Sequence, residues 1–365
     1  MKVCVYAICK NESQFARRWV SSMSEADHIY VLDTGSDDGT PELLSSLGAE
    51  VEIAVISPWR FDVARNRSLT LVPEDADICV CTDLDEFFHP GWRKLLEEAW
   101  VEGTQQAAYR YTWNFNPDGS EGYVFWQEKI HSRHGWEWAH PVHEVPVWLG
   151  EGQPRKVYVE GMQLDHRADS TKSRAQYLPL LEQSVREDPD DDRNMHYLGR
   201  EYYFHGMWRE AIDTLLKHVC MPNALWADER CASMRYIARS YMELEERGKA
   251  YVWLLRAVAE ATHLREPYMD MARMLYEDGD WDGVVYFSRR ALRIAERPRT
   301  YICESESWGA LPWDLLSLGL YYTGREEEAA AAAERAVELS PWDERLKRNL
   351  ELMRGKNAVD KSGEI

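Results

Sequence analysis

The sequence predicts a chain of two parts, an α/β domain with a doubly wound sheet and an all-α domain of repeated helical hairpins. In the first half, apolar β-branched runs that end at polar loops alternate with segments of helical periodicity, the pattern of a sheet with crossover helices. In the second half, small residues, tyrosines and glycines recur in four units. We therefore expect an α/β domain at 1–170, a helical repeat domain at 171–355 and a flexible tail at 356–365.

Composition and charge exclude several classes of protein. The 365 residues are 45% hydrophobic, and their formal charge is -20 at pH 7. Nucleic-acid wrapping and binding to an anionic membrane both need a basic face, so we expect neither. We find no run near the ~20 apolar residues of a membrane span, and the N-terminal apolar run is too short for a signal peptide. Seven scattered cysteines indicate buried thiols, so we expect a soluble, cytoplasmic protein.

The elements of the first half follow in the order of a doubly wound sheet. Apolar, β-branched runs predict strands at 3–9, 28–32, 51–56 and 77–88. Helical periodicity and helix-start signals predict helices at 13–24, 41–48 and 92–101, and a loop at 60–69 that enters a helix with Arg65 and Asn66 on its early turns. Two longer strands at 106–115 and 122–132 and a short strand near 156–159 complete this half. Together these segments predict a mostly parallel sheet with helices between its strands.

The strand at 77–88 carries the acids from which the functional prediction starts. Its apolar run ends at Asp83, Asp85 and Glu86, and ligands of open α/β sheets bind outside the strands' carboxyl ends. In extended backbone, Asp83 and Asp85 would point to the same face. Two such carboxylates suit a divalent cation that keeps open positions for phosphate oxygens. An isolated pair of this kind is more often a solvated acidic turn, so its neighbours decide the interpretation.

Three further segments accompany the acid pair, in a defined order. The four segments are 7–12 (AICKNE), 31–40 (VLDTGSDDGT), 59–69 (WRFDVARNRSL) and 83–86 (DLDE). In order and spacing they resemble the family 2 glycosyltransferases of the GT-A fold, in the bacterial and phage branch that appends tetratricopeptide repeats. The resemblance implies a Rossmann-like domain with a mixed sheet. It also implies transfer of a sugar from a nucleoside diphosphate sugar, with UDP favoured, and a requirement for Mn2+ or Mg2+.

The resemblance also implies roles for individual residues. The metal ligands would be Asp83, Asp85 and His166. The nucleotide sugar would contact Ala7, Lys10, Asn11, Glu12, Asp33, Asp38, Arg65 and Asp83. An inverting enzyme needs a carboxylate base, for which Glu144 is the first candidate and Glu86 the second. For the same residues, loop capping by the acids of 33–38, a structural ion pair of Glu144 and an ordinary buried role of His166 remain alternatives.

The second half repeats a small residue followed by a tyrosine, with a turn glycine in three of the four units. The small residues are Gly199, Ala238, Ala272 and Gly319, each followed by a tyrosine within one helical turn. The small residue lets paired helices approach, and the tyrosine packs between them, which is the tetratricopeptide pattern. We expect this domain to present a concave surface to an acceptor or to form a homodimer interface.

These observations predict a metal-dependent, inverting glycosyltransferase. The preferred acceptor is a peptide or protein side chain, because helical repeats usually bind polypeptide, and a glycolipid or polysaccharide precursor is the alternative. Two other functions stay open. A nucleotidyltransferase of similar fold would use paired acids, although the loop at 10–12 lacks the usual glycine. A non-catalytic tetratricopeptide adaptor with a vestigial transferase domain would use only the repeats.

Overall fold

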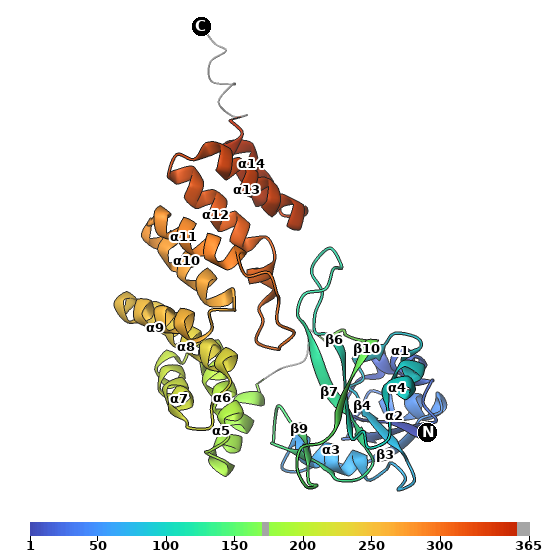
Figure 1. Ribbon diagram of the computed structural model, residues 1–365. Coiled ribbons are helices and arrows are strands. Elements are labelled where there is room, and N and C mark those ends of the chain that lie inside the picture. The colour runs from blue at the N-terminus through green and yellow to red at the C-terminus, as the bar shows by residue number, and fades with distance from the viewer. Residues whose placement is uncertain (170–174, 356–365) are drawn as a thin grey trace. The chain divides into compact units, whose positions relative to one another are not determined.

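The computed structural model describes residues 1–169 and 175–355, and the chain divides into two compact units between Asp188 and Pro189 (Figure 1). The first unit is α/β and the second is all-helical, as predicted. The predicted boundary at 170/171 and the predicted tail at 356–365 lie outside the described residues. No helix among the described residues is long and apolar enough to cross a membrane.

An eight-stranded mixed sheet organises the first unit, with the strand order β3-β2-β1-β4-β7-β6-β10-β5. Its parallel half contains β1 (Val3–Cys9), β2 (His28–Asp33), β3 (Glu50–Ile53) and β4 (Ile78–Cys81). Its other half contains β5 (Glu86–Phe88), β6 (Gln106–Thr112), β7 (Val124–Ser132) and β10 (Lys156–His166). β7 runs antiparallel to both β4 and β6, which makes the sheet mixed. A separate two-stranded sheet pairs β8 (Trp136–Ala139) with β9 (Val145–Trp148).

Four helices of the first unit pack against this sheet: α1 (Ser13–Met23), α2 (Thr40–Ser46), α3 (Phe61–Leu69) and α4 (Trp92–Ala99). A fifth helix, α5 (Tyr177–Glu187), ends this unit. In α1, Ala16, Trp19, Val20 and Met23 recur at helical spacing and are buried in the core. All seven residues of β1 are buried, as expected for a central parallel strand covered on both faces.

The acid-bearing strand predicted at 77–88 is interrupted, so the extended-backbone argument for Asp83 and Asp85 was wrong. β4 ends at Cys81, and the chain then turns, with the Glu86 N–H donating to the Asp83 carbonyl at 3.0 Å. The Glu86 carboxylate accepts from the Asp83 N–H at 2.9 Å and closes the turn. This return bond breaks the extended backbone, and β5 then pairs with β10 at the opposite edge of the sheet.

The last strand of the sheet is longer than predicted. The sequence predicts a short strand near 156–159, whereas β10 extends to His166. Its pairing with β6 is irregular between Tyr158 and Gln163 and then resumes, while β5 pairs with its last residues. Because two neighbours share the pairing of its final residues, the strand continues through a stretch whose sequence shows no simple alternation.

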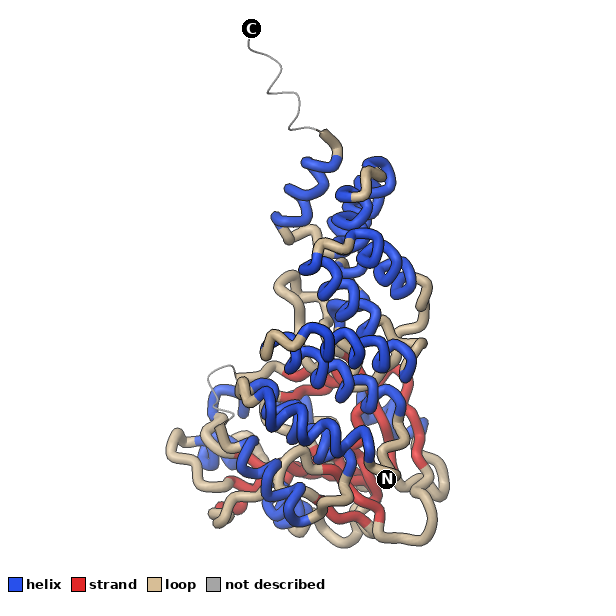
Figure 2. Tube along the Cα trace, turned by 90° about the vertical axis from the view of Figure 1, so that its left-hand side faces the viewer, coloured by secondary structure: helices blue, strands red, loops and turns tan. Residues whose placement is uncertain are grey.

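Paired helices form the second unit. They are α6 (Asp192–Phe204), α7 (Trp208–Cys220), α8 (Ala227–Glu243), α9 (Arg247–Glu260), α10 (Glu266–Asp278), α11 (Trp281–Leu292), α12 (Leu311–Tyr322), α13 (Glu326–Leu339) and α14 (Glu344–Met353), with the 3-10 helix η1 (Ser305–Trp308) before α12. Consecutive helices pack on one another, and α6, α8, α10 and α12 also contact one another in turn. The first helices of successive hairpins therefore form one layer. Figure 2 shows the helices of this unit, in blue, stacked on one another.

The repeat glycine of the first hairpin is required by close packing. A Cβ on Gly199 would lie 2.4 Å from Leu215 Cγ in α7. We expect Gly199→Ala to lower the free energy of unfolding of this unit by about 1–3 kcal/mol, because an added methyl overpacks the interface. Urea unfolding measures this effect. In the matched control Gly248→Ala, the added Cβ meets nothing within 4 Å. An equal loss of stability in both variants would contradict the prediction.

Candidate active site

The turn after β4 meets side chains from four other segments of the first unit. Arg65 comes from α3, Lys129 from β7, Glu144 from the loop before β9 and His166 from the end of β10. The sheet order explains the meeting, since β7 lies beside β4 and the end of β10 pairs with β5. Sequence positions far apart are thereby assembled around Asp83, Asp85 and Glu86.

Asp83 is held between two cations. One carboxylate oxygen accepts from Arg65 Nη2 at 2.5 Å and the other from Lys129 Nζ at 3.0 Å. Burial raises the pKa of the Asp83 carboxyl, but Arg65 and Lys129 outweigh it and hold that pKa well below its usual range. The Asp83 side chain is 32% exposed, so this ion-paired group is open to solvent on one side. Asp83 therefore positions two cationic side chains beyond the carboxyl end of β4.

Arg65 also binds the carboxylate that the resemblance assigns as the base. Arg65 Nε donates to Glu144 Oε1 at 3.1 Å, and its guanidinium lies 5.5 Å from the centre of the Trp138 ring. Arg65 is 2% exposed, whereas the Glu144 side chain is 11% exposed. The structure therefore shows the ion pair that is the alternative role of Glu144, and its role as base stays a prediction.

Glu86 braces the turn from inside. Besides closing the turn through the Asp83 N–H, its carboxylate accepts from the Tyr111 hydroxyl at 2.8 Å. Burial raises the pKa of Glu86, and Lys129 Nζ, 3.6 Å away, acts in the opposite direction. Both oxygens have partners and the residue is 2% exposed, so Glu86 is placed to hold the geometry of the neighbouring acids.

Asp85 and His166 form the second part of the site. His166 Nε2 lies 3.3 Å from Asp85 Oδ2, and His166 Nδ1 lies 2.9 Å from the Trp113 carbonyl oxygen. The carbonyl can only accept, so Nδ1 carries a proton and Nε2 faces the carboxylate. A carboxylate oxygen and an imidazole nitrogen are donors that Mn2+ takes, and the carbonyl partner orients the imidazole as in many metal sites. This pair fits a divalent cation.

The predicted set of three metal ligands is not assembled as such. Asp85 and His166 meet, while both oxygens of Asp83 face Arg65 and Lys129. Within residues 1–169 and 175–355, no group of three or more His, Cys, Asp or Glu side chains is placed to hold a metal ion. Any cation at the pair would thus need further ligands from outside the protein.

Asp33 and Asp38 hold the loop after β2. Asp33 is fully buried, and its Oδ1 accepts from the backbone N–H groups of Gly35 and Ser36 at 2.9 and 2.8 Å. Asp38 accepts from the Thr40 N–H at 3.0 Å. Burial tends to raise the pKa of Asp38, but hydrogen bonds from Thr40 and Ser13 lower it to about 2. The structure shows loop capping by both acids, and their contact with a nucleotide stays a prediction.

The remaining predicted contacts lie at the end of β1. Ala7 is buried in the core, and Lys10 is exposed. Asn11 has a φ of 55°, a conformation that asparagine tolerates better than most residues, and its Oδ1 accepts from the Asp37 N–H at 2.9 Å. The Glu12 N–H donates to Thr40 Oγ1 at 2.9 Å. These bonds join the two loops that would border a nucleotide, whose binding stays a prediction.

Sequence reasoning missed Lys129 and Tyr111. Lys129 lies on the same face of β7 as His131, which is fully buried in the structure, but the sequence of this strand does not indicate that this face is covered. The register Val80↔Ile130 then brings Lys129 beside the turn after β4. Because that register is a long-range pairing, no local pattern in the sequence indicates that Lys129 meets Asp83.

His131 provides a pH test of the packing beneath the site. Its Nε2 lies 2.7 Å from the Tyr6 hydroxyl and its Nδ1 lies 2.8 Å from the Ser132 carbonyl, so the neutral ring is satisfied. Burial lowers its pKa to about 4. From pH 6.5 down to 4, the unfolded chain binds the proton and the folded chain does not, so stability falls as pH falls. We expect His131 to contribute a loss of about 2 kcal/mol between pH 7 and pH 5.

The measurement is urea unfolding of the wild type and His131→Asn at both pH values. The variant should lose that part of the pH dependence, whatever its stability at pH 7. His134→Asn serves as the control, because the His134 side chain is 66% exposed. If wild type and His131→Asn show the same difference between the two pH values, His131 is not buried in its neutral form.

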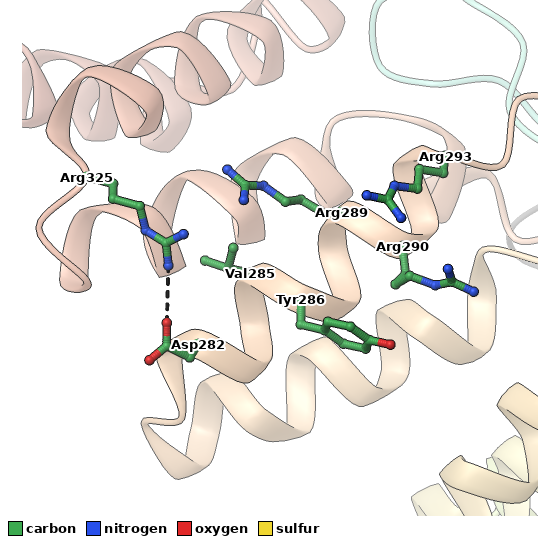
Figure 3. Close-up of a pocket in the computed structure, with 7 residues that line it drawn as sticks. All are labelled: Asp282, Val285, Tyr286, Arg289, Arg290, Arg293 and Arg325. Atoms are coloured by element: carbon green, nitrogen blue, oxygen red, sulfur yellow. Dashed lines mark hydrogen bonds and ion pairs between the residues drawn. The ribbon is translucent and has the colours of Figure 1, made fainter.

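A separate cavity of about 290 Å³ lies within the helical unit (Figure 3). It is lined by Asp282, Val285, Tyr286, Arg289, Arg290, Arg293 and Arg325. Arg325 Nη2 donates to Asp282 Oδ1 at 3.1 Å across it. Its lining is mainly cationic, in contrast to the acid-bearing turn of the first unit.

Comparison with known proteins supports the division into two parts. Residues 4–142 match the family model described as Glycosyl transferase family 2. A TPR repeat-containing protein of Synechococcus elongatus is 28% identical over 102 residues, which are 28% of this chain and 23% of that protein. The chain therefore matches about a quarter of the length of this relative.

Solved structures of low similarity were also found. MamA protein is 17% identical with a TM-score of 0.36, over 45% of this chain and 81% of that chain. Yeast Tom70 is 16% identical with a TM-score of 0.39, over 53% of this chain and 38% of that chain. At these scores, neither likeness carries an argument about this chain.

Proposed function

Because the first unit carries a glycosyltransferase family 2 domain, we propose that this chain transfers a sugar from a nucleoside diphosphate sugar, with UDP as the favoured nucleotide, to a polypeptide acceptor. The observation that supports the proposal most is the meeting of Asp85 with His166 beside Arg65 and Lys129. Donors for a cation and two fixed positive charges thus lie together beyond the carboxyl end of β4. Ligands of open α/β sheets bind outside the carboxyl ends of the strands.

The proposed reaction has a use both for the positive charges of Arg65 and Lys129 and for a cation held by Asp85 and His166. The diphosphate leaves the sugar with additional negative charge, which fixed positive charges stabilise when they are already oriented. Asp83 holds Arg65 and Lys129 in place, since its two oxygens bind them at 2.5 and 3.0 Å. Mn2+ or Mg2+, held by Asp85 and His166, would supply electrophilic stabilisation of the same leaving group.

The acceptor must lose a proton as it attacks the anomeric carbon in an inverting reaction, which requires a base. We assign this role to Glu144 because its side chain is more exposed than that of Glu86, whose two carboxylate oxygens both hold the turn. Arg65 Nε donates to one oxygen of this carboxylate at 3.1 Å and so orients it beside the site. The polypeptide nature of the acceptor rests on the helical repeats, since stacked helical hairpins usually bind peptides or proteins.

A thermal-shift panel of UDP-, GDP- and dTDP-sugars, each with Mn2+ or with EDTA, tests the proposal on the full chain. We expect one donor to raise the melting temperature of the first unit in Mn2+ and to lose most of that effect in EDTA. Mass action predicts about 2.7 kcal/mol of stabilisation at a hundred times the dissociation constant. Binding of a nucleoside triphosphate with pyrophosphate release would favour a nucleotidyltransferase. If the folded protein binds no nucleotide, the non-catalytic adaptor is the function that remains.

A further inference from the structure

The connection between α11 and α12 folds over the first helices of the earlier hairpins. Residues 261–265 suffice to join α9 to α10, whereas residues 293–310 separate α11 from α12. We call residues 299–309 the strap; they form the orange loop of Figure 1 and include η1. Strap side chains bind residues of α6, α8 and α10. These helices belong to the layer that α6, α8, α10 and α12 form, which we call the inner layer.

A carboxylate of the strap completes a buried ion cluster on α8. Glu304 Oε2 accepts from Arg235 Nη2 at 2.7 Å and from Arg239 Nη2 at 3.1 Å. Both arginines also bind Asp270 of α10, each through a contact of 2.8 Å. Arg235 is 2% exposed. A buried guanidinium is costly without carboxylate partners, so this surface favours a second carboxylate beside Asp270.

Glu266 of α10 recognises two N–H groups of the strap. Its Oε1 accepts from the Glu304 backbone N–H at 3.0 Å and from the Trp308 indole at 2.9 Å. The Arg265 guanidinium lies 4.4 Å from the centre of the Trp308 ring, within cation–π range. These contacts bind one backbone N–H group and one tryptophan of the strap, at positions 304 and 308.

An aromatic position completes the pattern at the other end of the strap. Tyr301 stacks on Tyr197 of α6, with ring centres 5.8 Å apart, and its hydroxyl donates to Glu229 Oε1 of α8 at 3.1 Å. Arg273 of α10 binds Glu306 at 2.6 Å. The inner layer thus contacts an aromatic residue, two carboxylates and a tryptophan within eight consecutive residues of the strap.

We propose that this inner face is a binding surface for an acidic, aromatic segment of a partner protein, and that the strap occupies it as an intramolecular stand-in. The groups that hold the strap recognise features of an extended peptide: a backbone N–H, carboxylates and aromatic rings. Concave inner layers of helical repeats are the surfaces by which such proteins bind extended ligands. A partner that displaces the strap must offer the same chemistry, with a carboxylate between Arg235 and Arg239. The proposal does not depend on sugar transfer.

Peptide binding to a chain with a weakened strap tests this proposal. The probe is a fluorescent octapeptide with the sequence of 301–308, serine replacing Cys303. An attached strap competes at millimolar effective concentration, so the wild type should bind this probe weakly. The double variant Tyr301→Ala, Glu304→Gln should bind it tightly. A peptide with glutamine in the Glu304 position should bind that variant roughly tenfold more weakly, because it loses a charged hydrogen bond. The control variant Glu328→Gln, which changes the exposed Arg289 pair, should behave as wild type.

Cysteine labelling measures the opening of the strap in the wild-type chain, so this test does not depend on whether the double variant folds. Cys303 of the strap is 3% exposed and Cys231 of α8 is fully buried. If the strap opens locally, the alkylating reagent should modify Cys303 faster than Cys231. Excess probe peptide should raise the alkylation rate of Cys303 without changing that of Cys231. Two results would overturn the proposal: a folded double variant that binds neither peptide, or equal rates at both cysteines with and without peptide.

Discussion

Replacing Asp85 by asparagine should remove the Mn2+-dependent stabilisation of the first unit by its sugar donor and reduce transfer by about 10²–10³-fold. Asparagine keeps the shape of the side chain but removes the charge that faces His166 Nε2 at 3.3 Å. The Asp85 side chain is 15% exposed and pairs with His166 beside the turn, so we expect the variant to fold. Thermal shift with donor and Mn2+, followed by a transfer assay with the donor identified in that way, measures both effects.

Asp37→Asn is the matched control for this substitution. Asp37 is an exposed acid in the loop after β2, and its backbone N–H, which the substitution keeps, binds Asn11. We expect this control to keep the donor-induced shift within error. If Asp85→Asn keeps the full Mn2+-dependent shift as well, the cation is not held at Asp85 and His166, and the proposed site must be abandoned.

Replacing Arg65 by leucine should lower the free energy of unfolding of the first unit by about 3–5 kcal/mol, because it removes two charged hydrogen bonds and leaves Glu144 without its cation. Arg65 is 2% exposed and binds both Asp83 and Glu144. Lys129 remains beside Asp83. Most of the loss should therefore come from Glu144, which loses its partner, and from the buried space that the guanidinium filled and leucine does not. Chemical denaturation followed by tryptophan fluorescence measures the change.

Arg67→Leu, two residues along the same helix, is the control. The Arg67 side chain is 54% exposed and pairs with Glu52 at the surface, so we expect a change of at most about 1 kcal/mol. Arg65→Lys should be intermediate, because lysine keeps the charge but not the fork that reaches two carboxylates. Comparable losses for Arg65→Leu and Arg67→Leu would show that the buried cluster does not stabilise the unit.

Local patterns predicted most of the α/β elements, because alternation and helical periodicity depend on neighbours in the chain. The helix predicted at 13–24 is observed at Ser13–Met23, and the strand predicted at 3–9 is β1. The prediction of one continuous strand at 77–88 was wrong, because a side chain there forms a hydrogen bond to the backbone that ends the extended conformation. The Glu86 carboxylate binds the Asp83 N–H and turns the backbone, and such a bond has no signature in hydrophobic alternation.

The sequence by itself determined the order of motifs, the two kinds of unit and the presence of acids at the end of β4, because each is encoded within a few turns or strands. Only the tertiary structure decided which charges share a site. Long-range strand pairing brings Lys129 to Asp83 and His166 to Asp85, and chain reversal after α11 brings Glu304 to Arg235. Each of these contacts joins residues dozens of positions apart. Their pairing depends on strand register and helix packing, which no local pattern specifies.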